Sequence, residues 1–202
     1  EFLDGSPACL VLGDNILHGA GLTETLTECA TLPDGAHIFG YRVRDAKRYG
    51  VVEIDDSGNP VSIEEKPERP RSPFAVPGLY FYGPDVCDLA AELEPSARGE
   101  LEITDLNRRY LEQNRLKVTV LDRGYAWLDA GTHRSLIEAS TYIEAIEERQ
   151  GLKIGCLQEI AWSKGWISDD EFRREAEAAA GSSYGTYLAE VLARAEDNIA
   201  GG

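Results

Sequence analysis

The stretch ACLVLGDN, residues 8–15, sets the class of fold. Its apolar run predicts a buried strand over residues 8–13, and Leu22, Leu26 and Cys29 follow at helical spacing up to a turn at residues 33–35. Further strands are predicted at 37–43, 50–54, 61–65, 78–82, 116–121 and 125–128, and helices at 84–94, 104–114, from Thr132 onward and after Cys156. Thr132 is expected to cap its helix, and residues 168–171 (SDDE) form a capping box. Strands and helices that mix through residue 150 indicate an α/β fold, with a helical appendage over residues 151–202.

The composition excludes several classes of function. Of the 202 residues, 43% are hydrophobic and 28% are charged, as in an ordinary globular domain. No apolar run reaches the ~18 residues that cross a bilayer, and a net charge of −16 argues against a nucleic-acid surface, which needs a basic stripe. The four cysteines show neither zinc-ligand spacing nor a disulfide pattern, so we expect reduced thiols in a cytoplasmic protein, with Cys9 and Cys87 in the core.

Two acidic motifs carry the most chemical information. VLGDN (11–15) and WLDAGT (127–132) each place one aspartate, Asp14 or Asp129, after a strand-like run and before turn-forming residues. Ligands of open α/β sheets bind outside the carboxyl ends of the strands, so the two carboxylates could together hold Mg²⁺ with the help of substrate phosphates. Either aspartate taken alone is more typical of a turn or a helix cap.

Six strings in a fixed order carry a resemblance to a known family. They are LGDN (12–15), YGVVE (49–53), EEKP (64–67), GLYFY (78–82), SARGELEITD (96–105) and WLDAGT (127–132). With these strings the chain resembles, over nearly its whole length, the bacterial glucose-1-phosphate thymidylyltransferases, which are sugar-nucleotide pyrophosphorylases that open dTDP-rhamnose synthesis. The resemblance implies a Rossmann-like nucleotidyltransferase sheet with flanking helices.

The resemblance also implies that this sheet is incomplete. Members of the family begin with a Gly-rich loop, roughly G-x-G-x-R-L-x-P-x-T, which cradles the nucleotide phosphates, and no such loop occurs in this sequence. We therefore expect a fragment in which residues 1–150 carry the sugar-phosphate and metal-binding part, without most of the nucleotide-binding part. For the chain by itself we expect no turnover.

The chemistry that the resemblance implies is nucleotidyl transfer, in which the phosphate of glucose 1-phosphate attacks the α-phosphorus of dTTP to give dTDP-glucose and pyrophosphate. It assigns Asp14 and Asp129 to Mg²⁺, and Lys66 and Arg98 to the phosphate of the sugar. Glu65 matches the carboxylate that accepts hydrogen bonds from sugar hydroxyls. The other matching sugar-lining positions are Asn15, Tyr49, Gly50, Val76 and Glu100.

Other interpretations stay open at several positions. By residue type alone Lys66 is a solvated surface lysine, Arg98 could pair with Glu100, and Tyr49 could be a packed aromatic ring. Because the base-reading segment is not in this sequence, UTP or another hexose 1-phosphate is an alternative substrate. A sugar-phosphate-binding or oligomerising piece without turnover is an alternative function.

Two further properties follow from the resemblance alone. Members of the family have a second nucleotide site between subunits that mediates feedback, and His18, Gly19, Glu159 and Ile160 fall on matching positions. The intact enzyme is expected to be a homotetramer, with residues 151–202 in its subunit contacts.

Overall fold

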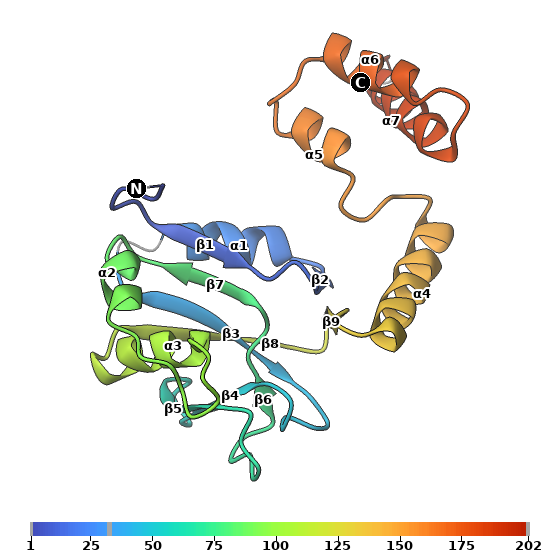
Figure 1. Ribbon diagram of the computed structural model, residues 1–202. Coiled ribbons are helices and arrows are strands. Elements are labelled where there is room, and N and C mark those ends of the chain that lie inside the picture. The colour runs from blue at the N-terminus through green and yellow to red at the C-terminus, as the bar shows by residue number, and fades with distance from the viewer. Residues whose placement is uncertain (1, 32–33, 201–202) are drawn as a thin grey trace. The chain divides into compact units, whose positions relative to one another are not determined.

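The computed structural model describes residues 2–31 and 34–200, except the side chains of 196–200, and divides into two units, Glu1–Ser140 and Thr141–Gly202. The strands are β1 Ala8–Val11, β2 Asn15–Gly19, β3 Ala36–Arg42, β4 Gly50–Ile54, β5 Pro60–Glu65, β6 Phe74–Ala75, β7 Leu79–Tyr82, β8 Leu116–Leu121 and β9 Tyr125–Asp129 (Figure 1). The helices are α1 Leu22–Ala30, α2 Val86–Ala91, α3 Ile103–Glu112, α4 His133–Gln150, α5 Leu157–Ser163, α6 Asp169–Ala178 and α7 Ser183–Ala200. The predicted α/β class with a helical C-terminal part is confirmed. Within the described residues, no helix has the length and apolarity needed to cross a membrane.

A mixed sheet forms the centre of the first unit. Its strand order is β1-β7-β3-β6-β4-β5, and β8 pairs with the other edge of β3. Among the strand pairs of the described chain, β3–β8 is parallel and the others are antiparallel. The sheet is therefore mostly antiparallel, because short turns such as the one between β4 and β5 can only join antiparallel neighbours.

Strands β6 and β7 are two pieces of one path interrupted at residues 76–78. Both pieces pair with the same edge of β3, at Tyr41–Ala75 and at Ala36–Tyr82. Pro77 lies in the interruption, where its missing N–H removes a ladder hydrogen bond. Val76 instead bonds to the first residue of β4, since its N–H donates to the carbonyl of Gly50 at 2.8 Å.

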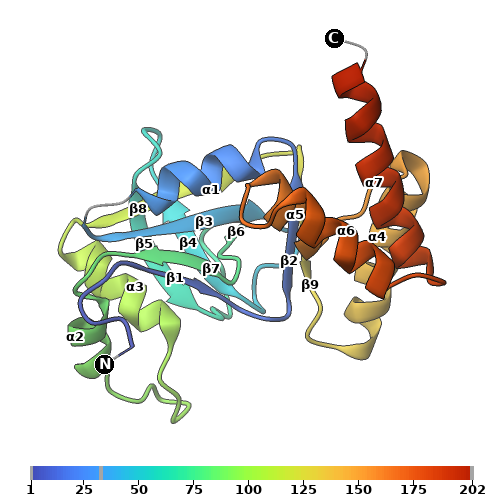
Figure 2. The ribbon, with the colours of Figure 1, turned by 90° about the horizontal axis from the view of Figure 1, so that it is seen from above.

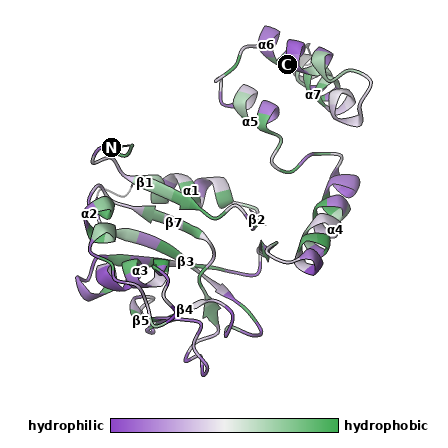
Figure 3. Cartoon of the chain, viewed as in Figure 1, coloured by the Kyte–Doolittle hydropathy of each residue, from purple (hydrophilic) through white to green (hydrophobic). Residues whose placement is uncertain are grey.

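Alternating residues of the central strands face two separate cores. On β3, Ile38 lies in a core with Tyr110 of α3, whereas Phe39 lies in a core with Cys29 of α1. This alternation is the period-2 pattern of a strand buried on both faces. Helices α1 and α3 consequently cover opposite sides of the sheet (Figure 2), and hydrophobic residues concentrate on the strands between them (Figure 3).

The first strand differs from its prediction. We expected a buried strand, but Leu10 and Val11 of β1 are exposed, because β1 pairs with β7 on one side and no other described strand pairs with it. The prediction that Cys9 and Cys87 lie in the core was also wrong, since both are exposed while Cys29 is buried. Strands β2 and β6 were not predicted from the sequence.

The second unit has a core of its own. Phe172 of α6 and Leu188 of α7 are fully buried there, together with Cys156 before α5. The predicted capping box is confirmed: Ser168 Oγ accepts from the N–H of Glu171, and the Glu171 carboxylate accepts from the N–H of Ser168. These paired bonds satisfy N–H groups that would otherwise lack partners at the start of α6.

Candidate functional site

A two-stranded sheet brings the two predicted metal ligands together. Strands β2 and β9 run antiparallel, with Asn15 at the start of β2 opposite Asp129 at the end of β9. The N–H of Ala130 donates to the carbonyl of Asp14 at 2.7 Å and extends this contact by one residue. The aspartates therefore meet through the small sheet, with Asp14 three residues after the end of the main-sheet strand β1 and Asp129 at the end of β9.

The two carboxylates face one gap at Gly131. A Cβ atom on Gly131 would lie 3.0 Å from Asp14 Oδ2 and 3.1 Å from Asp129 Oδ1. Asp129 Oδ1 also accepts from the N–H of Gly131 at 3.1 Å, so the turn interpretation of this aspartate describes part of its contacts. Within the described chain no group of three or more His, Cys, Asp or Glu side chains is placed to hold a metal ion. Two carboxylate oxygens fit a divalent cation whose other ligands are water and substrate phosphate, as Mg²⁺ prefers.

These carboxylates line a cleft of ≈ 210 Å³ in the first unit. The cleft is lined by residues from the turn before β2, the loop before β4, the end of β5, the β6–β7 interruption, the start of α3 and strand β9. The residues singled out from the sequence that line the cleft are Asp14, Asn15, Tyr49, Gly50, Glu65, Lys66, Val76 and Asp129, and Trp127 of the WLDAGT motif lines it as well. Arg98 and Glu100 do not line the cleft itself.

Glu65, the last residue of β5, is held from α3. Thr104 Oγ1 donates to Glu65 Oε2 at 2.5 Å, and Glu65 is half-buried. Gly50 makes this contact accessible, since a Cβ there would lie 3.0 Å from Thr104 Oγ1 and 3.4 Å from Glu65 Oε2. Thr104 thus fixes Oε2 of the carboxylate, and the missing side chain of Gly50 leaves the space beside this contact open.

Lys66 has an unusual backbone. Its φ of 42° lies in the left-handed region, which few residues other than glycine adopt. Its N–H donates to the carbonyl of Tyr49 at 3.0 Å, which fixes this conformation directly before Pro67. The exposed ammonium lies 3.5 Å from Glu65 Oε1. The positive charge of Lys66 is therefore next to a carboxylate that lines the cleft.

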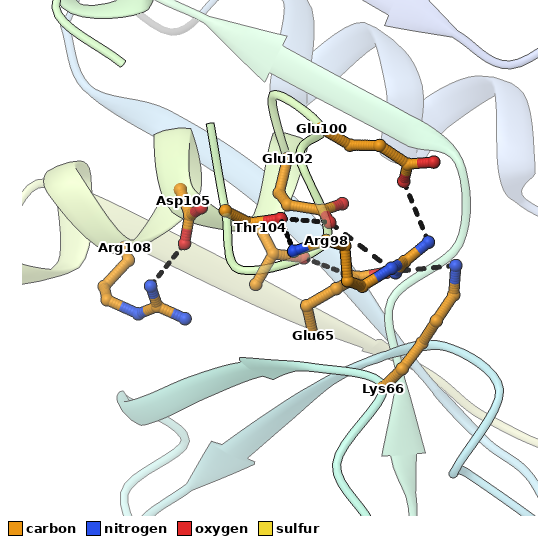
Figure 4. A network of polar contacts seen from close by, with 9 residues as sticks. Glu65, Lys66, Arg98, Glu100, Glu102, Thr104, Asp105 and Arg108 are labelled. Atoms are coloured by element: carbon orange, nitrogen blue, oxygen red, sulfur yellow. Dashed lines mark hydrogen bonds and ion pairs between the residues drawn. The ribbon is translucent and has the colours of Figure 1, made fainter. Parts of the chain in front are cut away.

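Arg98 reaches the same carboxylate from a loop (Figure 4). One of its terminal nitrogens lies 3.8 Å from Glu65 Oε1 and 3.5 Å from Glu102 Oε1, and the other lies 2.8 Å from Glu100 Oε2. The alternative pairing of Arg98 with Glu100 is therefore present in the structure. The guanidinium nevertheless lies within ion-pair distance of Glu65, a lining residue of the cleft.

Two tyrosine hydroxyls at the cleft stay neutral. Burial raises the pKa of Tyr49, and Asp129 raises it further against the opposing effect of Arg48. Burial also raises the pKa of Tyr80, with a contribution from Glu65. A neutral phenol can both donate and accept, so these groups add polarity to the walls without adding charge.

Sequence reasoning missed Thr104 and Glu102 as parts of this network. Both lie inside the string at residues 96–105, but nothing in that string shows that Thr104 reaches a carboxylate on β5. Glu102 is linked to Ser96, whose Oγ donates to Glu102 Oε1 at 3.0 Å, so it closes the loop that carries Arg98. The one available signal was the concentration of polar residues directly before α3.

The predicted regulatory residues belong to different units. His18 and Gly19 lie on β2, opposite Ala126 and Tyr125 of β9. Glu159 and Ile160 lie on α5 of the second unit, where the Glu159 carboxylate accepts a hydrogen bond from the Tyr187 hydroxyl. A nucleotide site shared by these four residues stays a prediction.

Comparison with known families identifies relatives of the chain. The model of a family described as nucleotidyl transferase matches residues 1–146. A glucose-1-phosphate thymidylyltransferase of Xanthomonas campestris is 53% identical over 194 residues, which are 96% of this chain and 66% of that protein. One from Mycobacterium tuberculosis is 50% identical over 185 residues, 92% of this chain and 64% of that protein. The chain thus spans about two thirds of the length of these curated relatives.

Solved structures show the same fold. A crystal structure from Bacillus anthracis, described as a glucose-1-phosphate thymidylyltransferase in complex with a sucrose, has a TM-score of 0.62 and 38% identity, and the match covers 70% of this chain and 56% of that one. A UDP-glucose pyrophosphorylase complexed with UDP-glucose also has a TM-score of 0.62, over 74% of this chain and 59% of that one. Its identity is 22%, so this second likeness concerns the fold alone.

Proposed function

The chain belongs to the nucleotidyl transferase family, and from this we propose that it carries the metal-binding and sugar-phosphate-binding part of a glucose-1-phosphate thymidylyltransferase. In that reaction a phosphate oxygen of glucose 1-phosphate forms a bond to the α-phosphorus of dTTP. The bond from that phosphorus to the oxygen bridging to the β-phosphate breaks, and pyrophosphate leaves with the electron pair. The observation that supports the proposal is that Asp14 and Asp129 face one gap in the cleft that Glu65 and Lys66 also line.

Asp14 and Asp129 are the residues that would hold the divalent ion that enzymes of this family generally use. We propose Mg²⁺, since the donor set consists of hard carboxylate oxygens and leaves positions for phosphate oxygens and water. When bound, the ion supplies charge neutralisation for phosphate oxygens that would otherwise repel one another. The protein contributes the spacing of the two carboxylates, which the β2–β9 pairing and Gly131 determine.

Lys66 and Arg98 are the residues that would hold the phosphate of the sugar. The net charge of the chain is −16, so an anionic substrate needs local cations to overcome the overall field. Lys66 offers a compact charge at the end of β5, and Arg98 offers a planar fork suited to two phosphate oxygens. The Arg98 contact to Glu65 is the longest of its three ion pairs, so a phosphate oxygen can replace it while Glu100 and Glu102 keep the side chain in place.

Glu65 would accept hydrogen bonds from hydroxyls of the hexose. Thr104 fixes one side of the carboxylate, and Gly50 leaves space for a ligand to approach. A site built around a fixed polar group rejects sugars that lack the matching hydroxyl, because the carboxylate would then lose its partner. Asn15, Tyr49 and Val76 form further parts of this wall.

Calorimetric titration of the chain with glucose 1-phosphate tests the proposal directly. We expect glucose 1-phosphate to bind in the presence of Mg²⁺ more tightly than glucose or inorganic phosphate, because the cleft offers contacts to both halves of the molecule. Failure of glucose 1-phosphate to bind better than either half would contradict the proposal. Pyrophosphate release measured with dTTP and with UTP then distinguishes the thymidylyltransferase from a uridylyltransferase, and from a binding piece without turnover.

We also propose that the protein self-associates as a homotetramer through its second unit. Leu157 is 75% exposed and Trp166 is 74% exposed, which is unusual for large apolar side chains and typical of contact surfaces. Sedimentation velocity of the chain tests this, with Trp166→Ala as the variant expected to shift the distribution towards the monomer. A monomer for the unmodified chain at micromolar concentration would overturn this part of the proposal.

A further inference from the structure

The side-chain amide of Asn15 connects three parts of the cleft. Its Oδ1 accepts from the indole N–H of Trp127 at 2.6 Å and from the backbone N–H of Gly78 at 2.9 Å. Its Nδ2 donates to Asp14 Oδ1 at 2.9 Å. One side chain therefore joins strand β9, the β6–β7 interruption and the carboxylate of Asp14, which directly precedes β2.

The chemistry of these partners determines which way the amide points. An indole N–H and a backbone N–H can only donate, so the atom that faces them must be the amide oxygen. The amide nitrogen then has to face Asp14. Both lone pairs of Oδ1 and one N–H are used, and no described residue accepts from the second N–H.

The bond from Asn15 also determines which oxygen of Asp14 is available. Oδ1 of Asp14 accepts from Asn15, whereas Oδ2 is the atom 3.0 Å from the Cβ position of Gly131, beside Asp129 Oδ1. A partial rotation of the carboxylate about its terminal bond would lose the contact to Asn15, and a half-turn would only exchange its two equivalent oxygens. The hydrogen bond thus holds Oδ2 at the gap between the two aspartates.

Trp127 in turn is held by two aromatic neighbours. Its ring lies 4.9 Å from that of Tyr49 and 5.7 Å from that of Tyr41, measured between centroids. The indole N–H therefore has one stable direction, and it points to Asn15 Oδ1. A chain of contacts runs from a packed aromatic group through an amide to the carboxylate.

We propose that Asn15 is a positioning residue: Trp127 and Gly78 orient its amide, the amide orients Asp14 for a divalent cation, and the remaining N–H donates to an acceptor oxygen of the bound substrate. This inference rests on the proposed function and makes it more specific. It assigns Asn15 a role towards the metal site in addition to the sugar-lining position, and it limits any direct ligand contact to donation. Partners of this kind that orient a metal ligand typically change metal affinity by about 10- to 100-fold.

Binding of Mn²⁺ to the chain, followed by electron paramagnetic resonance, tests the role of Asn15 without requiring turnover. Mn²⁺ prefers the same oxygen ligands as Mg²⁺. We expect Asn15→Leu, which keeps the approximate shape of the side chain and removes its hydrogen bonds, to weaken Mn²⁺ binding by about 10- to 100-fold. Asn59→Leu is the matched control, because Asn59 is an exposed asparagine outside the cleft whose Nδ2 also donates to an aspartate, Asp55, at 3.3 Å. Its Mn²⁺ affinity should equal that of the unmodified chain.

Trp127→Phe tests the same chain of contacts if Asn15→Leu fails to fold. Phenylalanine keeps an aromatic ring beside Tyr49, but it lacks the indole N–H that donates to Asn15. We expect about 3- to 10-fold weaker Mn²⁺ binding, the scale of one hydrogen bond. In ¹H–¹⁵N spectra the indole signal that is lost in Trp127→Phe should shift in Asn15→Leu and stay in place in Asn59→Leu.

The outcomes separate this inference from the function on which it rests. Asp14→Asn with the Mn²⁺ affinity of the unmodified chain would overturn the proposed metal site, and this inference with it. If Asp14→Asn weakens binding but either folded variant, Asn15→Leu or Trp127→Phe, does not, the positioning role alone is overturned. An indole signal of Trp127 that is unchanged in Asn15→Leu would also overturn it.

Discussion

Lys66 combines a strained backbone with a charge at the cleft. A left-handed φ at a residue other than glycine costs on the order of 1–3 kcal/mol and persists where surrounding contacts enforce it. The hydrogen bond to Tyr49 and the following Pro67 do so here. Such strain concentrates at ligand sites, which favours a phosphate-binding role over that of a solvated lysine.

Replacing this charge should weaken binding of the sugar phosphate. We expect Lys66→Ala to reduce the affinity for glucose 1-phosphate by about 1.5–3 kcal/mol, the scale of a hydrogen bond to a charged group. Calorimetric titration measures the effect, with Lys117→Ala as control, because Lys117 is an exposed lysine of the same unit on β8. Equal affinities of Lys66→Ala and the unmodified chain would remove Lys66 from the site.

Gly131 offers a test of the gap between the two aspartates. A methyl group there would lie within 3.1 Å of both carboxylate oxygens and displace them, so we expect Gly131→Ala to weaken Mn²⁺ binding by about 10-fold or more. Gly13→Ala is the control, since a Cβ at Gly13, next to Asp14 in the chain, would meet no atom within 4 Å. Similar Mn²⁺ affinities for the two variants would mean that the gap is not the metal position.

At the scale of elements, the small β2–β9 sheet has the largest effect on the site. It carries Asn15 and Asp129 in opposite positions and places Trp127 against Leu17. Two strands alone are marginally stable in water. The pair is supported by side-chain contacts, among them the Tyr41 hydroxyl, which donates to the carbonyl of Tyr125 at 3.2 Å.

Close packing within this pair can be tested at Gly19. A Cβ there would lie 2.6 Å from Tyr125 Cδ1 and 2.8 Å from the carbonyl oxygen of Gly124. We expect Gly19→Ala to lower the free energy of unfolding by about 1–3 kcal/mol, as overpacking does elsewhere. Urea denaturation measures the change. If Gly19→Ala were as stable as Gly13→Ala, the two strands could move apart at this point without a loss in the free energy of unfolding.

The junction between α4 and α5 should respond to acid. Hydrogen bonds from Lys153 and from the N–H of Ile154 hold the pKa of Glu147 below its ordinary value of 4.5. A carboxyl whose pKa is lower in the folded state stabilises that state above the ordinary pKa, and the contribution is lost as the pH falls through the lowered value. We therefore expect the urea midpoint, read from tryptophan fluorescence, to fall between pH 7 and pH 3 more in the unmodified chain than in Glu147→Gln. Glu148→Gln, which replaces an exposed neighbour, should show the same fall as the unmodified chain, and an equal fall in all three would exclude Glu147 as the cause.

The described residues form three hydrophobic cores that share no residue. Two lie on the two faces of the first unit's sheet, one around Ile38 and Tyr110 and one around Phe39, and the third lies in the second unit around Phe172 and Leu188. Each core is contained within one of the two units. A unit that buries its own apolar residues can unfold as a cooperative whole.

We accordingly expect two unfolding transitions in urea. In Trp127→Phe the remaining tryptophans, Trp162 and Trp166, report on the second unit, and circular dichroism of the same sample reports on both units. The fluorescence and dichroism midpoints should differ. A single transition with coincident midpoints would show that the two units unfold as one.

The sequence by itself determined the features that depend on residues close together in the chain, such as helices, strands and caps. Alternation and helical spacing predicted most elements, the Ser168 capping box was readable from its spacing, and Thr132 was identified as a cap, where its Oγ1 accepts from the N–H of Ser135 at 3.1 Å. Asp14 and Asp129 could be named as partners because each lies in a recognisable motif. All these signals are local, since helix geometry, strand pleat and caps involve residues a few positions apart.

Only the tertiary structure decided which distant atoms meet. Strand β2 has no clear pattern of its own and exists because β9 pairs with it. The contact of Thr104 with Glu65 and the choice of Asp14 Oδ2 over Oδ1 at the Gly131 gap depend on register and packing between segments far apart in sequence. Burial of Cys29 and exposure of Cys9 depend in the same way on which faces are covered. Long-range pairing sets these contacts, because the energy of each one depends on a partner that no local pattern encodes.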